Sequence, residues 1–123
     1  MNEGRTLFQS EMNVSRETME RLDIYAGLLA KWTQRINLVS PKTLPELWHR
    51  HFMDSAQLTA FADKGHWVDI GSGGGFPGAV VAIMAPETPV TLVEADQRKA
   101  AFLRTVARET EVFFEVKTQR IED

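Results

Sequence analysis

Cysteine is absent from the 123-residue sequence. This absence excludes disulfide bonds, thiolate metal sites and a cysteine nucleophile, and it is typical of proteins in the reducing cytosol. Long apolar runs are lacking too, because no segment approaches the roughly 20 consecutive apolar residues of a membrane span. Residues 1–5 show no apolar signal-peptide core. We therefore expect a soluble, cytoplasmic protein.

A strong excess of charge is also missing, since the formal net charge is −3. This balance does not indicate a nucleic-acid binder, although a local basic face can contact phosphates whatever the total charge. The length suits one domain and is too short for two of ordinary size. Neither an internal repeat nor a low-complexity tract is visible.

The most informative stretch is a glycine cluster in the middle of the chain. The short apolar run Trp67–Ile70, which contains Asp69, is followed by five glycines within residues 71–78 and then by the apolar segment 79–85. This order predicts a strand, a loop and a buried helix. Glycines allow positive φ angles or a close approach of backbone N–H groups to a ligand. A plain turn needs only one or two glycines, so we predict a ligand-binding loop.

Two kinds of ligand fit this loop. Residues 73–78 satisfy G-x-G-x-x-G, the dinucleotide fingerprint, and Glu94 lies at about the right distance for a ribose carboxylate. However, Asp69 beside the loop would repel a diphosphate, and Pro77 removes one N–H donor. An acid suits an ammonium or sulfonium group, and S-adenosylmethionine carries both. S-adenosylmethionine is therefore favoured, with a nicotinamide cofactor such as NAD as the alternative.

Other segments have helix and strand patterns. After a polar start, Ser15 is a plausible cap for a helix that ends near Asn37. Pro45 fits the first turn of a second helix that Lys64-Gly65 closes. Further strands are expected over 89–94 and 112–116, with a helix between them capped by Asp96. The expected apolar face of the first helix consists of Leu22, Tyr25 or Ala26, Leu29, Trp32 and Ile36. That of the second helix consists of Leu47, Trp48, Phe52, Ala56 and Leu58. That of the helix capped by Asp96 consists of Ala100, Leu103, Val106 and Ala107, with Phe102 at the margin.

Residues 48–55 combine histidines with other polar side chains. His49 and His51 are two apart and so lie on different helix faces, which argues against a shared metal ion. A triad of Ser55, Asp54 and a histidine from this same helix has poor geometry. The segment is either a polar patch with Arg50 and Asp54 paired at four residues, or a basic edge beside the glycine loop. Both interpretations remain open.

Glu94 falls at the carboxyl end of a buried strand, where open parallel sheets bind their ligands. A carboxylate there can accept hydrogen bonds from both hydroxyls of a ribose. The next helix carries basic side chains that can meet phosphate or simply be solvated. These are Arg98, Lys99, Arg104 and Arg108.

Several segments in order resemble one family, the bacterial small-subunit ribosomal RNA guanine-N7 methyltransferases, also called glucose-inhibited division protein B. The resemblance covers about residues 20–123. It rests on Trp32 through Asn37-Leu38-Val39-Ser40, the block Arg50-His51-Phe52-Met53-Asp54-Ser55, the loop 68–78 ending in Phe76-Pro77-Gly78, Glu94 with Arg98-Lys99, and Gln119-Arg120-Ile121-Glu122.

The resemblance implies an α/β protein with a Rossmann-like S-adenosylmethionine domain. Residues 1–63 would form an N-terminal helical cap, and residues 64–123 the first half of the cofactor-binding domain. Family members continue well beyond residue 123, which implies a truncated chain with three parallel strands and an unpaired sheet edge. The implied substrate is a guanosine of 16S rRNA, either in naked RNA or in the assembled small subunit.

The resemblance also implies roles for single residues. The methionine end of the cofactor would meet Asp69 and the loop residues Gly71, Ser72, Gly73, Gly75 and Phe76. Glu94 would bind the ribose, and Ile121 with Glu122 the adenine. Arg120 and Arg50 are candidates for cofactor or RNA contact, and His51, Arg98 and Lys99 for RNA contact.

N7 of guanine already bears a lone pair, so methyl transfer needs no general base, and we expect neither a catalytic side chain nor a metal ion. A cofactor- or RNA-binding fragment without catalytic activity is a second alternative.

Overall fold

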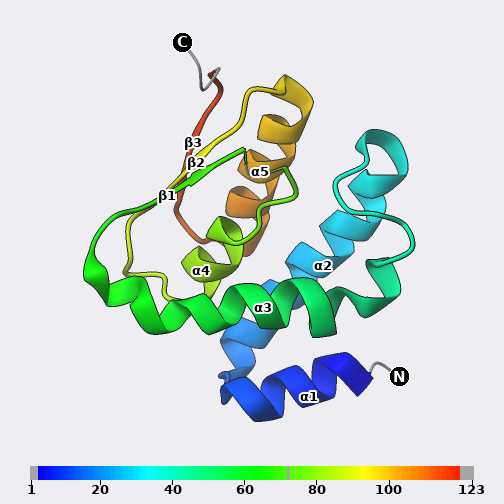
Figure 1. Ribbon diagram of the computed structural model, residues 1–123, viewed down its shortest axis with the longest axis vertical. Coiled ribbons are helices and arrows are strands. Elements are labelled where there is room, and N and C mark those ends of the chain that lie inside the picture. The colour runs from blue at the N-terminus through cyan, green and yellow to red at the C-terminus, as the bar shows by residue number, and fades with distance from the viewer. Residues whose placement is uncertain (1–2, 72, 120–123) are drawn as a thin grey trace.

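The computed structural model describes residues 3–71 and 73–119, shown in Figure 1. Three strands pair in parallel in the order β1-β2-β3. They are β1 (Trp67–Ile70), β2 (Val90–Val93) and β3 (Glu115–Lys117). The helices α4 (Gly78–Met84) and α5 (Gln97–Thr110) follow β1 and β2 along the chain. The predicted α/β class with a parallel sheet is confirmed.

One face of the sheet is covered and the other is open. Side chains along β1 alternate between the faces, so Trp67 and Asp69 share the side on which α4 begins. Val68 and Ile70, on the opposite side, are each 56% exposed. The described part of the chain therefore leaves apolar side chains of its sheet in contact with solvent.

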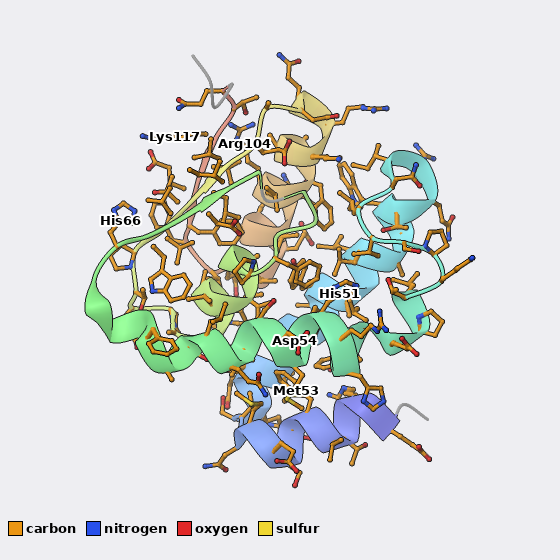
Figure 2. The ribbon with its side chains drawn as sticks, viewed as in Figure 1. His51, Met53, Asp54, His66, Arg104 and Lys117 are labelled. Atoms are coloured by element: carbon orange, nitrogen blue, oxygen red, sulfur yellow. The ribbon has the colours of Figure 1, made fainter. Side chains whose placement is uncertain are left out.

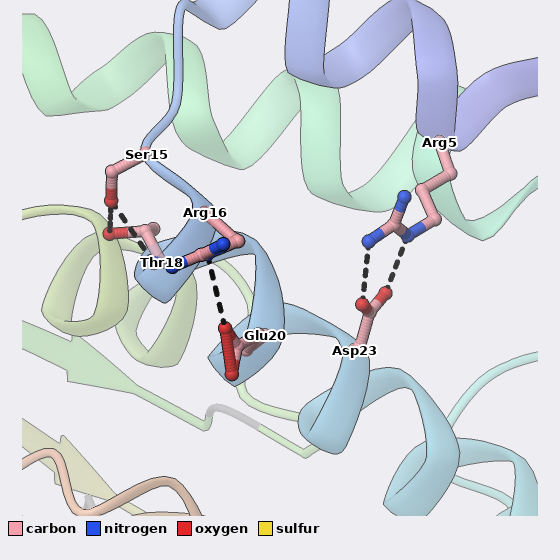
Figure 3. A network of polar contacts seen from close by, with 6 residues as sticks. All are labelled: Arg5, Ser15, Arg16, Thr18, Glu20 and Asp23. Carbon is pink, nitrogen blue, oxygen red and sulfur yellow. Dashed lines mark hydrogen bonds and ion pairs between the residues drawn. The ribbon is translucent and has the colours of Figure 1, made fainter.

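Helix α2 (Arg16–Ile36) matches its prediction closely. The hydroxyl of Ser15 accepts a hydrogen bond from the Thr18 N–H at 3.1 Å, as Figure 3 shows, and Asn37 ends the helix with a φ of 52°. On the inner face Leu22, Tyr25 and Leu29 are fully buried, while Trp32 and Ile36 are partly buried. The predicted caps and apolar face are confirmed.

Helix α1 (Glu3–Met12) was not predicted, because the start of the sequence is mostly polar. It packs through Phe8, which is fully buried with its ring centroid 5.3 Å from that of Trp48. The Arg5 guanidinium also donates two hydrogen bonds to the Asp23 carboxylate, at 2.7 and 2.6 Å (Figure 3). Both side chains of this pair are over one third exposed, so the apolar contact of Phe8 contributes more to docking α1.

The helix predicted from Pro45 to Lys64 is a helical segment whose hydrogen-bond pattern changes along its length. It consists of η1 (Leu44–Glu46, 3-10), η2 (Trp48–Phe52, π), α3 (Met53–Ala56) and η3 (Gln57–Lys64, 3-10). Pro45 lies in its first turn, as predicted. The apolar side holds for most positions, but the prediction that Leu58 belongs to it was wrong, since Leu58 is 36% exposed.

Two further predictions need correction. The third strand occupies residues 115–117 instead of 112–116, and Phe113, assigned to it, is 84% exposed. Phe102 is fully buried, not marginal, because its ring packs against Trp32 at a centroid distance of 5.5 Å. The predicted cap of α5 is confirmed, since the Asp96 carboxylate accepts hydrogen bonds from the N–H groups of Arg98 and Lys99.

A single cluster of buried side chains joins the N-terminal helices to the sheet. Fully buried members include Tyr25 from α2, Phe52 from η2, Leu92 from β2 and Leu103 from α5. The division into a cap over 1–63 and a cofactor-binding part over 64–123 stays a prediction. Within the described ranges, no helix has both the length and the apolar character needed to cross a membrane.

Candidate functional site

The loop between β1 and α4 follows a path that only glycine tolerates easily. The φ angles are 72° at Gly71, 57° at Gly73 and 100° at Gly75, in a region that residues with a Cβ rarely adopt. The Gly71 N–H donates to the Val93 carbonyl at 2.8 Å, so the loop begins where β1 leaves the sheet. The glycines predicted to give the loop its shape do so.

Gly78 has an ordinary φ angle, and glycine is needed there because Leu92 and Asp69 pack closely against its Cα. A Cβ at this position would lie 2.1 Å from Leu92 Cδ2 and 2.9 Å from Asp69 Oδ2. Its N–H donates to Asp69 Oδ2 at 2.8 Å. The Asp69 carboxylate therefore joins the end of β1 to the first turn of α4.

We expect Gly78→Ala to lower the free energy of unfolding by about 1–3 kcal/mol, because the added methyl group must displace Leu92 or Asp69. Urea unfolding followed by circular dichroism measures the change. Gly27→Ala is the matched control: a Cβ at Gly27 meets nothing within 4 Å, and alanine is the better helix former. Equal stabilities of the two variants would contradict the packing role of Gly78.

Glu94 reaches the glycine loop from the end of β2. Its side chain is only 8% exposed; Oε1 accepts a hydrogen bond from the Gly73 N–H at 2.7 Å and Oε2 one from the Asp96 N–H at 3.0 Å. Each carboxylate oxygen has a second lone pair, so two hydroxyl donors can still be bound. The structure thus brings together the acid and the loop that the sequence assigned to one site.

Tyr25 of α2 supports the same loop from its buried side, and the sequence analysis did not predict this role. It is fully buried, and its hydroxyl donates to the Gly74 carbonyl at 2.5 Å. Burial, with the Asp69 carboxylate adding to it, raises the pKa of the Tyr25 phenol well above its usual value, so the hydroxyl keeps its proton. The sequence signal was a tyrosine on an otherwise apolar helix face, which had been assigned only to the core.

His51 and Arg50 lie beside the far end of the loop. The His51 ring stacks on the Phe76 ring, with centroids 4.9 Å apart and an interplanar angle of 27°. Burial and the neighbouring Arg50 lower the pKa of His51, so its ring is neutral at pH 7. Of the two interpretations left open for this segment, the one that pairs Arg50 with Asp54 is not observed, because Arg50 Nε lies 3.0 Å from Glu46 Oε1 instead.

The basic side chains of α5 have different surroundings. Arg98 and Lys99 lie in its first turn, a few residues after Glu94, and the Arg98 side chain is 71% exposed. Arg104, labelled in Figure 2, donates to the Val116 carbonyl and the Thr118 hydroxyl, at 3.1 and 2.9 Å, and so ties α5 to β3.

Four predicted site residues lie outside the described residues: Ser72, Arg120, Ile121 and Glu122. In the part of the chain that is described, no group of three or more histidine, aspartate or glutamate side chains is placed to hold a metal ion.

Comparisons with known proteins place the chain in a family. Residues 18–123 match the family described as rRNA small subunit methyltransferase G, or GidB. Relatives named ribosomal RNA small subunit methyltransferase G include one from Ruegeria pomeroyi, 56% identical over 90% of this chain, and one from Jannaschia sp., 49% identical over 100% of it. The aligned region is 57% of the Ruegeria protein and 61% of the Jannaschia protein, so the chain spans about three fifths of their length.

The family match covers the glycine loop, Glu94 and the Arg50–Ser55 block, which are the features on which the resemblance rested. Over this length, identities near 50% are far above the level at which a family assignment is in question. The chain belongs to the rRNA small subunit methyltransferase G (GidB) family.

Proposed function

We propose that this chain is the cofactor-binding part of an S-adenosylmethionine-dependent methyltransferase with a Rossmann-like fold. The proposed reaction transfers a methyl group to N7 of a guanosine in 16S rRNA of the small ribosomal subunit. The family and the printed names of the relatives support an rRNA substrate. Because the chain spans only about three fifths of these relatives, the activity is proposed for the full-length protein, acting in the cytoplasm.

One observation carries the proposal: a buried carboxylate, Glu94, touches a loop of bare glycine backbone at the carboxyl ends of two adjacent parallel strands. Open α/β sheets bind nucleoside ligands at this edge. In this arrangement Glu94 accepts the ribose hydroxyls. The methionine end lies along Gly71, Gly73, Gly75 and Phe76, with Asp69 supplying negative charge near the sulfonium.

The residues present fit this cofactor, because Glu94 retains acceptor capacity and two of the loop glycines leave open space where a Cβ would stand. These are Gly71 and Gly73. When bound, the cofactor supplies an electrophilic methyl group. The residues of the loop and Glu94 would orient the bound cofactor toward the guanine N7, and such orientation is worth about 7–11 kcal/mol of barrier in favourable cases.

A calorimetric titration with S-adenosylhomocysteine and with NAD tests the proposal on this chain. We expect S-adenosylhomocysteine to bind and NAD to bind at least about tenfold more weakly, because Asp69 repels a diphosphate and Pro77 offers it no N–H donor. Tighter binding of NAD would replace the methyltransferase assignment by that of a nicotinamide-binding domain.

The open face of the sheet favours a second candidate function, a cofactor- or RNA-binding unit without transfer activity of its own. Val68 and Ile70 are each 56% exposed there, whereas parallel sheets are normally covered on both faces. Methylation of purified small ribosomal subunits by this chain and by a chain of the relatives' full length distinguishes the two. If only the longer chain is active, the result would support the second candidate function for these 123 residues.

A further inference from the structure

A hollow of about 280 Å³ lies beside the end of the glycine loop. One wall is the helical segment from Arg50 to Leu58, and the other is Phe76 with Pro77. Figure 2 labels His51 and Asp54 on this segment, where it crosses the middle of the molecule. The hollow is separate from the contact between Glu94 and Gly73, which lies at the beginning of the same loop.

Two polar side chains of this hollow have unused hydrogen-bonding capacity. Ser55 is only 5% exposed, yet its hydroxyl has no hydrogen-bond partner among the described residues. Asp54 is exposed, and in the same part of the chain its carboxylate makes neither a hydrogen bond nor an ion pair. Both groups can therefore form hydrogen bonds with a ligand that enters the hollow and carries matching polar groups.

The remaining walls suit a flat ring. His51 and Phe76 form the stacked pair described above, and Pro77 and Leu58 add apolar surface. Neutral aromatic side chains are the usual stacking partners of bases that have left a nucleic-acid helix. The Arg50 side chain is 62% exposed, with its Nε 3.0 Å from Glu46 Oε1. An exposed guanidinium beside the hollow can also contact a phosphate of the RNA.

We propose that this hollow binds an unstacked guanine base of RNA, the base whose N7 receives the methyl group. This inference rests on the proposed function and names the residues that select its substrate. The Asp54 carboxylate accepts hydrogen bonds from guanine N1–H and from its N2 amino group, and Ser55 bonds to the same edge of the base. Guanine held in this way keeps N7 free, whereas adenine presents an acceptor at N1 and is rejected.

The two parts of the site lie at the two ends of one short loop. Two residues separate Gly73, which touches Glu94, from Phe76, which lines the hollow, so their Cα atoms are three steps of chain apart. An extended chain covers at most about 3.6 Å per residue, so these two positions lie within about 11 Å of each other. A cofactor with its ribose on Glu94 would therefore have the hollow within reach of its methionine end.

The test compares two short single-stranded RNAs, one with a single guanosine and one with adenosine in its place, by fluorescence anisotropy. We expect the wild-type chain to prefer the guanosine RNA by about tenfold, and Asp54→Asn and Ser55→Ala to reduce that preference. Glu87→Gln, which changes an exposed carboxylate outside the hollow, is the matched control and keeps the preference. A guanosine preference that survives Asp54→Asn in a folded protein would overturn the assignment.

Titrating the same variants with S-adenosylhomocysteine separates this inference from the proposed function. We expect its affinity to be unchanged by Asp54→Asn. A tenfold loss would mean that the hollow holds the amino-acid end of the cofactor, which overturns the base assignment and leaves the methyltransferase proposal intact. Selective, Asp54-dependent binding of guanosine RNA by a chain that binds no S-adenosylhomocysteine would instead support the base site and refute the proposed function.

Discussion

Replacing Tyr25 by alanine is expected to lower the free energy of unfolding by about 3–5 kcal/mol. Tyr25 is fully buried, and its ring stacks on Phe52 at 5.3 Å and lies 5.8 Å from Phe76 and 6.4 Å from Phe102. The substitution leaves a cavity where α2, the helical segment and the glycine loop meet. Urea unfolding followed by circular dichroism measures the loss.

Tyr25→Phe separates the ring from the hydroxyl. It keeps the packing but leaves the buried Gly74 carbonyl without its donor, which costs about 1–3 kcal/mol. We also expect weaker binding of S-adenosylhomocysteine, because the loop loses its support. Phe113→Ala is the control: the side chain is 84% exposed, and its removal should change stability by less than about 0.5 kcal/mol. A Tyr25→Ala variant as stable as this control would refute the role in packing.

The sequence predicted best those elements that have a regular pattern of apolar residues and, at their ends, residues typical of helix caps or strand boundaries. Helix α2 begins after Ser15 and ends at Asn37, and α5 begins after Asp96. The strand β2 is buried at all four positions, matching its continuous apolar run. In these elements the local signals and the tertiary packing favour the same structure.

The elements that were missed depend on contacts made far along the chain. Helix α1 buries only Gly4 and Phe8, so its stability comes from packing Phe8 against Trp48, which no local pattern reveals. Phe102 was placed at the margin of α5 because its burial depends on Trp32 of another helix. Sequence periodicity reports how side chains are spaced on one helix and does not show which second element covers them.

In the candidate site, too, some contacts were predictable from the sequence and others depend on residues far apart in the chain. The contact of Glu94 with Gly73 was predictable, because carboxyl ends of adjacent parallel strands meet at one edge of a sheet. The support from Tyr25 was not, since 49 positions separate it from Gly74. The pairing of Arg50 with Glu46 instead of Asp54 also escaped prediction, because both acids lie four residues from Arg50 and spacing alone does not choose between them.

Replacing Glu94 by alanine is expected to weaken the binding of S-adenosylhomocysteine by more than about tenfold, and up to about a hundredfold. Two effects act together. The ribose hydroxyls lose a charged acceptor, and the N–H groups of Gly73 and Asp96 lose the oxygens that fix the loop to the end of β2. Calorimetric titration measures the affinity, and a thermal unfolding curve establishes that the variant is folded.

Glu94→Gln separates the two effects in part, because its amide oxygen can still accept from Gly73, while the negative charge and the acceptor for the Asp96 N–H are gone. An affinity between those of the wild type and Glu94→Ala is the expected result, with Glu87→Ala, outside the site, unchanged. Full affinity in a folded Glu94→Ala chain would show that the ribose is not bound at this carboxylate. The glycine loop would then act without an acid from β2, and the strongest geometric argument for an adenosyl ligand would be lost, since the loop alone is compatible with many anions.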